Sequence, residues 1–251
     1  MTGPAQTGPA RPGAGDPADL ERAIAELESA LQARDAFLRV ATHELRGPLA
    51  AIQLQADTIS LLVKQGAGPN DIDARAARVS RLVQRLARLL EEVLDLARAS
   101  SGRLSLQRGE TDLAAVVRGE IERARDDLRR AGCEVRVSGP ARLIGRWDQA
   151  RIEHAVGALL TAVAGAGQGQ PIEVALGDEG GRARIEVRGA GGVPEPQRSL
   201  AFGGFDEVVR GGAPGQNALA LWLARTVAEG HGGALELDEG GGALSLPRDR
   251  S

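Results

Sequence analysis

Hydrophobic residues in the first hundred positions recur in steps of three and four, the pattern of amphipathic helices. The first stripe consists of Leu20, Ile24, Leu27 and Leu31. Its alternating steps of four and three predict a short coiled coil over residues 17–36, which Arg34 interrupts. The stripe resumes at Leu38 and continues to Val63. We therefore predict one long helix, which begins at the capping pair Asp16-Pro17.

A second amphipathic helix is predicted after the breakers of residues 66–70. Its stripe runs from Val79 to Leu96, and Ser100-Ser101-Gly102 is a plausible stop. Residues 37–102 thus form a predicted helical hairpin. One hairpin leaves its apolar stripe half covered, so we expect it to dimerise into a four-helix bundle.

The second half, residues 103–251, mixes alternating runs with helical segments and glycine-rich loops, the pattern of an α+β unit with a sheet covered by helices on one face. The runs that predict strands are residues 103–106, 134–138, 142–147, 171–176, 182–187, 234–237 and 243–246. The segments that predict helices are residues 112–131, 148–164 and 216–229. Residues 189–217 are expected to be a glycine-rich loop region.

Composition narrows the class of protein further. The formal net charge of -3, from 31 basic and 34 acidic residues, offers no basic surface for nucleic acid or a membrane. The single Cys133 excludes an internal disulfide, which fits a reducing compartment. Residues 1–16 are rich in Gly, Pro and Ala and predict a disordered leader. No apolar run reaches transmembrane length, so we expect a cytoplasmic protein without a membrane segment.

The chemistry of the chain concentrates at the pair His43-Glu44 in the first long helix. Helix geometry places His43 roughly 200° from the apolar stripe, on the solvent side. An imidazole beside a carboxylate can act as a nucleophile whose proton the carboxylate takes. Pro48 removes an amide that would bond the carbonyl of Glu44, so the helix is expected to bend there. The other histidines, His154 and His231, are expected at a helix surface and at a helix C-terminus favoured by its dipole.

The stretch Phe37–Leu49 resembles the phosphoacceptor box of bacterial two-component sensor histidine kinases, F-L-x-x-x-x-H-E-L-R-x-P-L. Residues 90–106 are similar to the segment that leads into the ATP-binding domain of that family. Arg151-Ile152-Glu153 and His231-Gly232-Gly233 match landmarks of the domain itself. The resemblance covers roughly residues 20–247. It implies a dimerising helical hairpin followed by a Bergerat-type α/β sandwich, the histidine kinase ATPase fold.

The resemblance assigns roles to the residues of the box. His43 would be phosphorylated on its ring, and Glu44 would be the base that activates it. Arg46, Gly47 and Pro48 would be structural residues next to the site. Family members with phosphatase activity usually carry Thr or Asn four residues after the histidine, where this chain has Gly47. Dephosphorylation by that route is therefore not expected.

The ATP-binding half departs from the family at the residues that hold the nucleotide. The metal-binding asparagine falls at Ala162, and no aspartate is available at Arg188-Gly189 for the adenine. The glycines of the second phosphate motif fall at Ala218 and Ala220. We therefore expect a fold retained without its nucleotide and no metal site, with ATP and Mg²⁺ as cofactors only if the protein is a working kinase.

These observations predict a histidine phosphotransferase built on a kinase scaffold. His43 would carry a phosphoryl group to or from the aspartate of a response-regulator receiver domain. The expected partners are receiver domains and a second copy of the chain, with a separate sensor protein as a further candidate and no nucleic acid. Two alternatives stay open: a sensor kinase that phosphorylates His43 from ATP, and a non-enzymatic dimerising scaffold that sequesters kinases or regulators.

Overall fold

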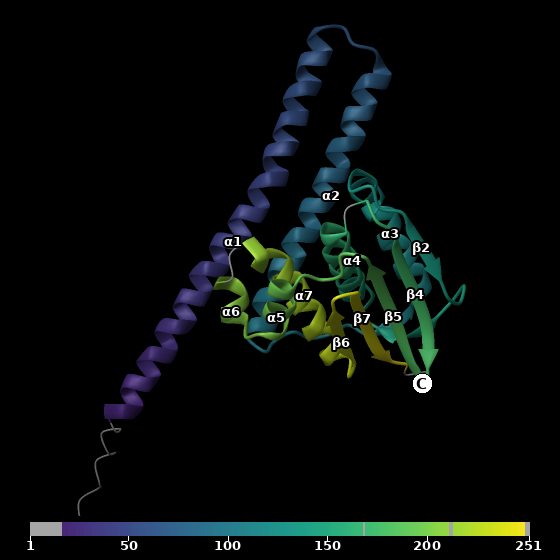
Figure 1. The fold of residues 1–251 in the computed structure, drawn as a ribbon. Helices are drawn as coiled ribbons and strands as arrows, with labels where there is room; N and C mark the ends of the chain where they lie inside the picture. Colours follow the sequence, from purple (N-terminus) through teal and green to yellow (C-terminus); the bar gives the residue numbers. More distant parts are fainter. Residues whose placement is uncertain (1–16, 168, 211–212, 249–251) are drawn as a thin grey trace, which may run out of the picture.

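The computed structural model describes residues 17–167, 169–210 and 213–248, and its first feature is a long helical hairpin (Figure 1). Helix α1 (Pro17–Lys64) is continuous through Pro48, and helix α2 (Pro69–Ser100) returns beside it. Gly102 follows α2 with φ +67°, a left-handed conformation that ends a helix and favours glycine. The hairpin prediction is confirmed. The predicted disordered leader, residues 1–16, lies outside the described residues.

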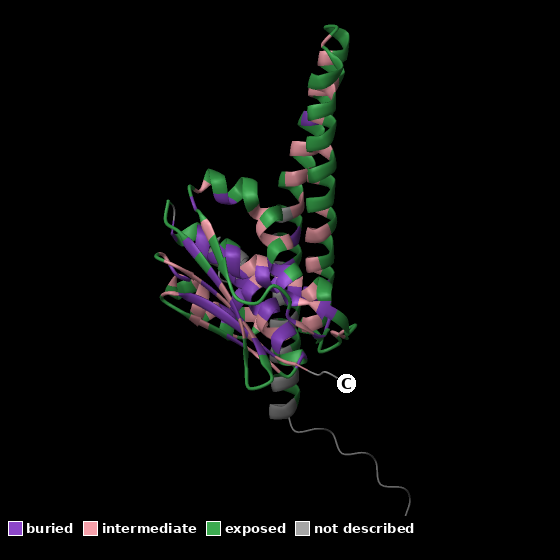
Figure 2. Ribbon diagram, turned by 90° about the vertical axis from the view of Figure 1, so that its right-hand side faces the viewer, coloured by how far each residue is buried: buried purple, intermediate pink, exposed green. Residues whose placement is uncertain are grey.

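The hairpin leaves much of its apolar surface uncovered. Leucines and valines of both helices are largely exposed: Leu20, Ile24, Leu27, Leu31, Leu38, Leu49, Leu54, Leu61, Val63, Val83, Leu90 and Leu94. The part of the hairpin farthest from the rest of the protein is mostly exposed (Figure 2). Within the described part of the chain, no helix combines the length and apolar character needed to cross a membrane.

The second half contains two sheets. A two-stranded antiparallel sheet joins β1 (Gly109–Asp112) and β3 (Ile144–Trp147). The main sheet has the strand order β2-β4-β5-β7-β6 and is antiparallel apart from the parallel pair β2–β4. Its strands are β2 (Val135–Ser138), β4 (Ile172–Glu179), β5 (Arg182–Gly189), β6 (Ala234–Asp238) and β7 (Gly241–Pro247).

Helices cover one face of the main sheet (Figure 1). They are α3 (Leu113–Arg130), α4 (Gln149–Ala166) and α7 (Ala213–Gly230), with the shorter α5 (Glu195–Phe202) and α6 (Phe205–Arg210) beside α7. On β5 the buried positions alternate with partly exposed ones, because one face of the strand meets the helices and the other meets solvent. The core between the layers is aliphatic apart from Trp147 and Trp222. The α/β sandwich prediction is confirmed.

Two local predictions were wrong. Residues 103–106 are not a strand: Leu104 and Leu106 alternate because they are half-buried in a linker that packs on one side, with Leu106 beside Gly230. The region of residues 189–217 is not only loop, since it contains α5 and α6. Pro194 precedes α5 and suits a helix start, and Gly203-Gly204 separates the two helices. These helices are only about two turns long, and the glycines between and around them favoured a loop prediction.

Candidate functional site

The phosphoacceptor residue expected from the sequence is exposed on α1. His43 lies in the middle of that helix, and its side chain is solvent-accessible. Phe37 and Ala41, on the other side of the same helix, are buried. Helix geometry separates His43 from Ala41 by about 200°, so the histidine is turned away from the side on which α1 is buried. The predicted exposure of His43 is confirmed.

The residues that follow His43 are accessible too. Glu44 is helical in its backbone, but its side chain lies outside the described residues. Arg46 and Gly47 are exposed, and Pro48 is half-buried. A Cβ added to Gly47 would meet no atom within 4 Å, so larger side chains fit at this position. The roles of these residues stay predictions that follow from the resemblance.

The positions expected to bind the metal and the adenine are buried, crowded or already paired. Ala162 on α4 is buried, with 3% of its surface exposed. Gly189 ends β5 on the face covered by helices: a Cβ there would lie 2.6 Å from Cγ1 of Val163 on α4. Arg188 belongs to the opposite, open face of the sheet, where it pairs with Glu186 at 2.7 Å and with Asp238. An acidic side chain at position 189 therefore has no space unless α4 shifts.

The residues expected at the second phosphate motif lie inside a helix. Ala218 and Ala220 lie several residues past the first residue of α7, which begins at Ala213. From the fifth helical residue onward, a backbone N–H bonds a carbonyl of the preceding turn. The amides of Ala218 and Ala220 are therefore committed inside the helix and do not point at a ligand. Ala218 is also fully buried.

The described residues at these positions do not fit a magnesium-bound nucleotide. Ala162, Gly189, Ala218 and Ala220 carry no oxygen ligand in their side chains, whereas Mg²⁺ requires oxygen. Arg188 brings a positive charge that its carboxylate partners already neutralise. Among the described residues, no group of three or more His, Cys, Asp or Glu side chains is placed to hold a metal ion.

A charged joint connects the hairpin to the second half. Asp95 of α2 is buried, and its Oδ1 accepts a hydrogen bond of 3.0 Å from Arg151 of α4. Arg151 also donates to Asp148, which caps α4 and accepts the amide of Gln107 in the linker at 2.8 Å. Burial alone would raise the pKa of Asp148, but the hydrogen bonds from Gln107 and Arg151 outweigh burial and lower it. The ionised Asp148 therefore binds the linker directly and, through Arg151, is connected to Asp95 of the hairpin.

His231 completes this joint, in a role that the sequence analysis did not predict. It follows α7, but it is buried rather than presented to solvent. Its Nε2 accepts the amide of Asp148 at 2.9 Å, and its Nδ1 donates to the carbonyl of Val227 at 2.8 Å. Burial lowers the pKa of His231. The predicted position at a helix C-terminus is confirmed, but the ring is a neutral acceptor rather than a cation stabilised by the helix dipole.

An aromatic contact also connects the two halves, at α1 of the hairpin. The ring of Phe205 on α6 lies 5.8 Å from Phe37 on α1 and 5.2 Å from Trp222 on α7, measured between centroids. Tilted rings at these distances attract one another beyond their buried area. Phe37 precedes His43 by six residues, so the second half docks on α1 less than two turns from the candidate phosphoacceptor.

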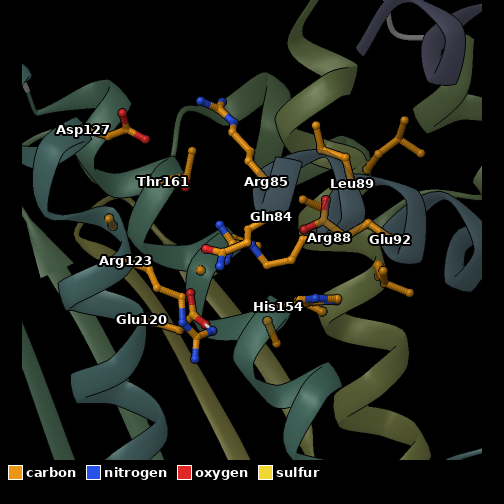
Figure 3. Close-up of a pocket in the computed structure, with 18 of the residues that line it drawn as sticks. Gln84, Arg85, Arg88, Leu89, Glu92, Glu120, Arg123, Asp127, His154 and Thr161 are labelled. Carbon is orange, nitrogen blue, oxygen red and sulfur yellow. Dashed lines mark hydrogen bonds and ion pairs between the residues drawn. The ribbon is translucent and has the colours of Figure 1, made fainter. Parts of the chain in front are cut away.

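Between these contacts lies a cleft of about 1240 Å³ (Figure 3). It is lined by α2, α3, α4 and α7 together with Phe37 and Ala41 of α1, and Figure 3 shows charged side chains of α2 and α3 around it. His154 was expected at a helix surface, but it is half-buried in the floor, and its Nδ1 is buried without a hydrogen-bond partner among the described residues. Burial raises the pKa of the nearby Glu92, and the neighbouring His154, Arg88 and Arg85 partly oppose this rise.

Comparison with known families decides what this architecture is. Residues 33–102 match the model of the His Kinase A phospho-acceptor domain. Residues 147–245 match the model of the histidine kinase-, DNA gyrase B- and HSP90-like ATPase. The chain belongs to the bacterial two-component histidine kinase family. This histidine kinase family member therefore carries a phosphoacceptor domain and an ATPase-type domain of two-component signal transduction.

Solved structures of histidine kinases share the fold. The histidine kinase AdeS from Acinetobacter baumannii matches with a TM-score of 0.53 and 16% identity, over 83% of this chain and 98% of that one. Full-length ShkA in complex with AMPPNP matches with a TM-score of 0.51 and 18% identity, over 71% of this chain and 40% of that one. The comparison with curated protein sequences gave no match.

Sequence reasoning missed several residues that the fold of this histidine kinase family member brings together. The Asp95–Arg151 pair joins positions 56 residues apart, and no local pattern announces it. Phe205 follows the glycine pair Gly203-Gly204, so it was predicted to lie in a loop. The cleft around His154 could not be predicted, because it depends on how α2 packs against α4. Only the arginines of α2, at helical spacing, offered a signal that could have been read directly.

Proposed function

We propose that this chain is a dimeric phosphorelay protein in which His43 exchanges a phosphoryl group with the aspartate of a receiver domain. A ring nitrogen of His43 attacks the phosphorus of the aspartyl phosphate. The bond from phosphorus to the aspartate oxygen breaks and leaves a carboxylate, and Glu44 takes the proton that the imidazole loses. The reverse reaction returns the group to a receiver. Mg²⁺ and the acidic pocket come from the receiver, so the chain supplies nucleophile, base and docking surface.

The observation that carries this proposal is the contrast between the two halves. The second half is docked on the side of α1 that carries Phe37 and Ala41. His43 is exposed on the other side of the helix. In the second half, the amides of Ala218 and Ala220 are committed inside α7. The nucleophile is presented to a partner, whereas the groups that would deliver phosphate from ATP are not available. This contrast supports an inactive ATP-binding half.

A docking surface next to His43 supports the choice of a protein as phosphoryl donor. Leu54 and Leu61 follow His43 by 11 and 18 residues, which returns each to within about 20° of its direction on the helix. Their side chains are 63% and 54% exposed. Exposed leucines in line with the nucleophile suit an apolar surface of a docked receiver. They extend from the histidine toward the tip of the hairpin.

Dimerisation accounts for another set of exposed apolar residues. Leu38 and Leu49 on α1, with Val83, Leu90 and Leu94 on α2, flank the contact between the two helices. A second hairpin would cover both flanks in a four-helix bundle.

We further propose that residues 17–36 form a coiled coil in the dimer, that residues 37–102 form the phosphoacceptor domain, and that residues 103–251 form the ATP-binding-like domain. A separate sensor protein could act on the coil.

Labelling experiments test the proposal. The purified chain is incubated with labelled ATP·Mg²⁺ and, separately, with a panel of phosphorylated receivers. We expect acid-labile label from at least one receiver, none from ATP, and complete loss of label in His43→Gln. Label from ATP that depends on His43 would identify a working kinase and contradict the proposal. Label from neither donor across a complete receiver panel would favour a non-enzymatic scaffold.

A further inference from the structure

Helix α2 presents a row of arginines to the cleft that it shares with the second half. The row consists of Arg78, Arg81, Arg85 and Arg88. Steps of three and four keep these residues on one face over about 15 Å of helix. None of them has an ion-pair partner within the part of the chain that the structure describes. Like charges at this spacing repel one another, so the row is unfavourable unless an anion lies beside it.

The opposite wall of the cleft supplies little negative charge to balance the row. Three of the four acidic residues of α3 already pair with arginines of their own helix, in the pairs Glu120–Arg123, Glu122–Arg125 and Asp127–Arg130. The fourth, Asp126, lines the cleft without an ion-pair partner among the described residues and offsets one positive charge. Arg123 is also bonded to Glu153 of α4 at 2.8 Å. Arg129 adds a further positive charge to this wall, without an ion-pair partner among the described residues. The cleft as a whole is therefore positively charged, and Glu92 only partly offsets the row.

The floor of the cleft has a different character. Leu89, Ala158 and Leu223 make much of it apolar. His154 leaves Nδ1 buried without a partner there, which is an open hydrogen-bonding position. Ala162, Arg188 and Gly189, at the positions expected to hold metal and adenine, do not line the cleft, whereas Ala220, from the expected phosphate motif, does. A cleft of about 1240 Å³ is large enough for a small molecule with several charged groups.

The proposed dimer would leave this cleft accessible. Arg81 and Leu90 are nine residues apart, as are Arg85 and Leu94, and nine residues correspond to about half a turn of direction on a helix. The arginine row and the exposed leucines therefore occupy opposite sides of α2. A second hairpin packed on Leu90 and Leu94 would not cover the arginines.

We propose that this cleft binds a phosphoanhydride chain, supplied by inorganic polyphosphate or by a nucleoside polyphosphate. Guanidinium groups match the oxygens of phosphate with paired hydrogen bonds, and several in a row match a chain of phosphates. The bound chain connects α2 with Arg129 of α3 and so fixes the second half against the hairpin. This ligand is regulatory and donates no phosphoryl group to His43.

Calorimetry on the full chain tests the site with inorganic tripolyphosphate, ATP and a poly-glutamate peptide as probes. We expect tripolyphosphate to bind, and the Arg81→Gln/Arg85→Gln variant to bind it at least about tenfold more weakly. Binding by the wild-type protein should also weaken with salt. Arg39→Gln, which removes an exposed arginine of α1 away from the cleft, should bind as the wild type does.

The probes separate the possible outcomes. Equal binding of tripolyphosphate and ATP identifies the phosphate chain as the ligand, and tighter binding of ATP identifies a nucleotide. The proposal is overturned by no binding, by binding that the double variant leaves unchanged, or by tighter binding of poly-glutamate. Transfer from a receiver to His43 should persist in the double variant, so failure of this site and failure of the proposed phosphotransfer are distinguishable. Binding of ATP alone that survives in the double variant would instead point to a nucleotide site in the second half.

Discussion

Arg151 of α4 reaches across to Asp95 of α2 and donates a hydrogen bond of 3.0 Å to its carboxylate. Both side chains are nearly buried, with 13% and 8% of their surfaces exposed. A charged pair that is withdrawn from water depends on the presence of both partners. Because one partner belongs to the hairpin and the other to the second half, the pair holds the two halves in one relative orientation.

Asp95→Ala should therefore loosen the joint. It leaves Arg151 with Asp148 as its remaining carboxylate partner, and we expect a loss of about 1–3 kcal/mol in the free energy of unfolding. Proteolysis within the linker, residues 103–108, should become faster. Arg98→Ala is the matched control, since Arg98 is 54% exposed and also pairs with Asp95, at 3.2 Å. That change should cost less than about 1 kcal/mol. Equal losses in urea unfolding would contradict the assigned role of Arg151.

His231 should make stability depend on pH. Burial lowers its pKa in the folded state, so the unfolded chain binds a proton first as the pH falls. The stabilising contribution of the neutral ring is complete above the ordinary imidazole range, about pH 6.5, and decreases below it. His231→Gln keeps an acceptor for the amide of Asp148 and removes this titration. Urea unfolding at pH 7.5 and pH 5.5 should show a smaller pH-dependent loss in the variant. An identical pH dependence of the two proteins would argue against a neutral His231.

A substitution at Gly47 should add receiver dephosphorylation to the activity of the protein. A Cβ at this position meets nothing within 4 Å, and the residue is exposed four positions after His43. By the resemblance to kinases with phosphatase activity, Gly47→Thr should position a water and shorten the lifetime of phosphoryl groups on a docked receiver severalfold. Gly47→Ala shares the change in backbone freedom without the hydroxyl and serves as control. Loss of labelled phosphate over time measures both, and equal lifetimes in the two variants would exclude this role for position 47.

Leu54 should contribute to receiver docking. Leu54→Glu introduces a charge into the exposed apolar line that extends from His43, so the rate of phosphotransfer at low receiver concentration should fall about tenfold or more. Gln53→Glu adds a charge at the neighbouring position, which helix geometry turns about 100° away, and should have little effect. The helical content of both variants, measured by circular dichroism, should match the wild type. Undiminished transfer by Leu54→Glu would place the receiver elsewhere.

Local patterns in the sequence predicted the elements well wherever one face of an element is buried. The stripes of α1 and α2 and the alternation of β4 and β5 belong to this class. The same rule misled at Leu104 and Leu106, because a linker packed on one side alternates without pairing to a strand. The exposure of His43 followed from its angle to the stripe. The joint of Asp95, Arg151 and His231 depends on the packing of distant segments, which no spacing along the chain encodes.

The scarcity of aromatic residues has a practical consequence. The protein has two tryptophans, and only Trp222 belongs to the ring cluster through which α6 and α7 meet α1. Trp147 lies in the core of the second half, where its indole N–H donates to the carbonyl of Pro247 at 2.8 Å. Replacement of Trp147 by Phe would leave one emitter, situated at the boundary between the halves. Its fluorescence would then report, in real time and without an attached dye, whether the second half stays on α1 or swings away when a receiver or an anion binds.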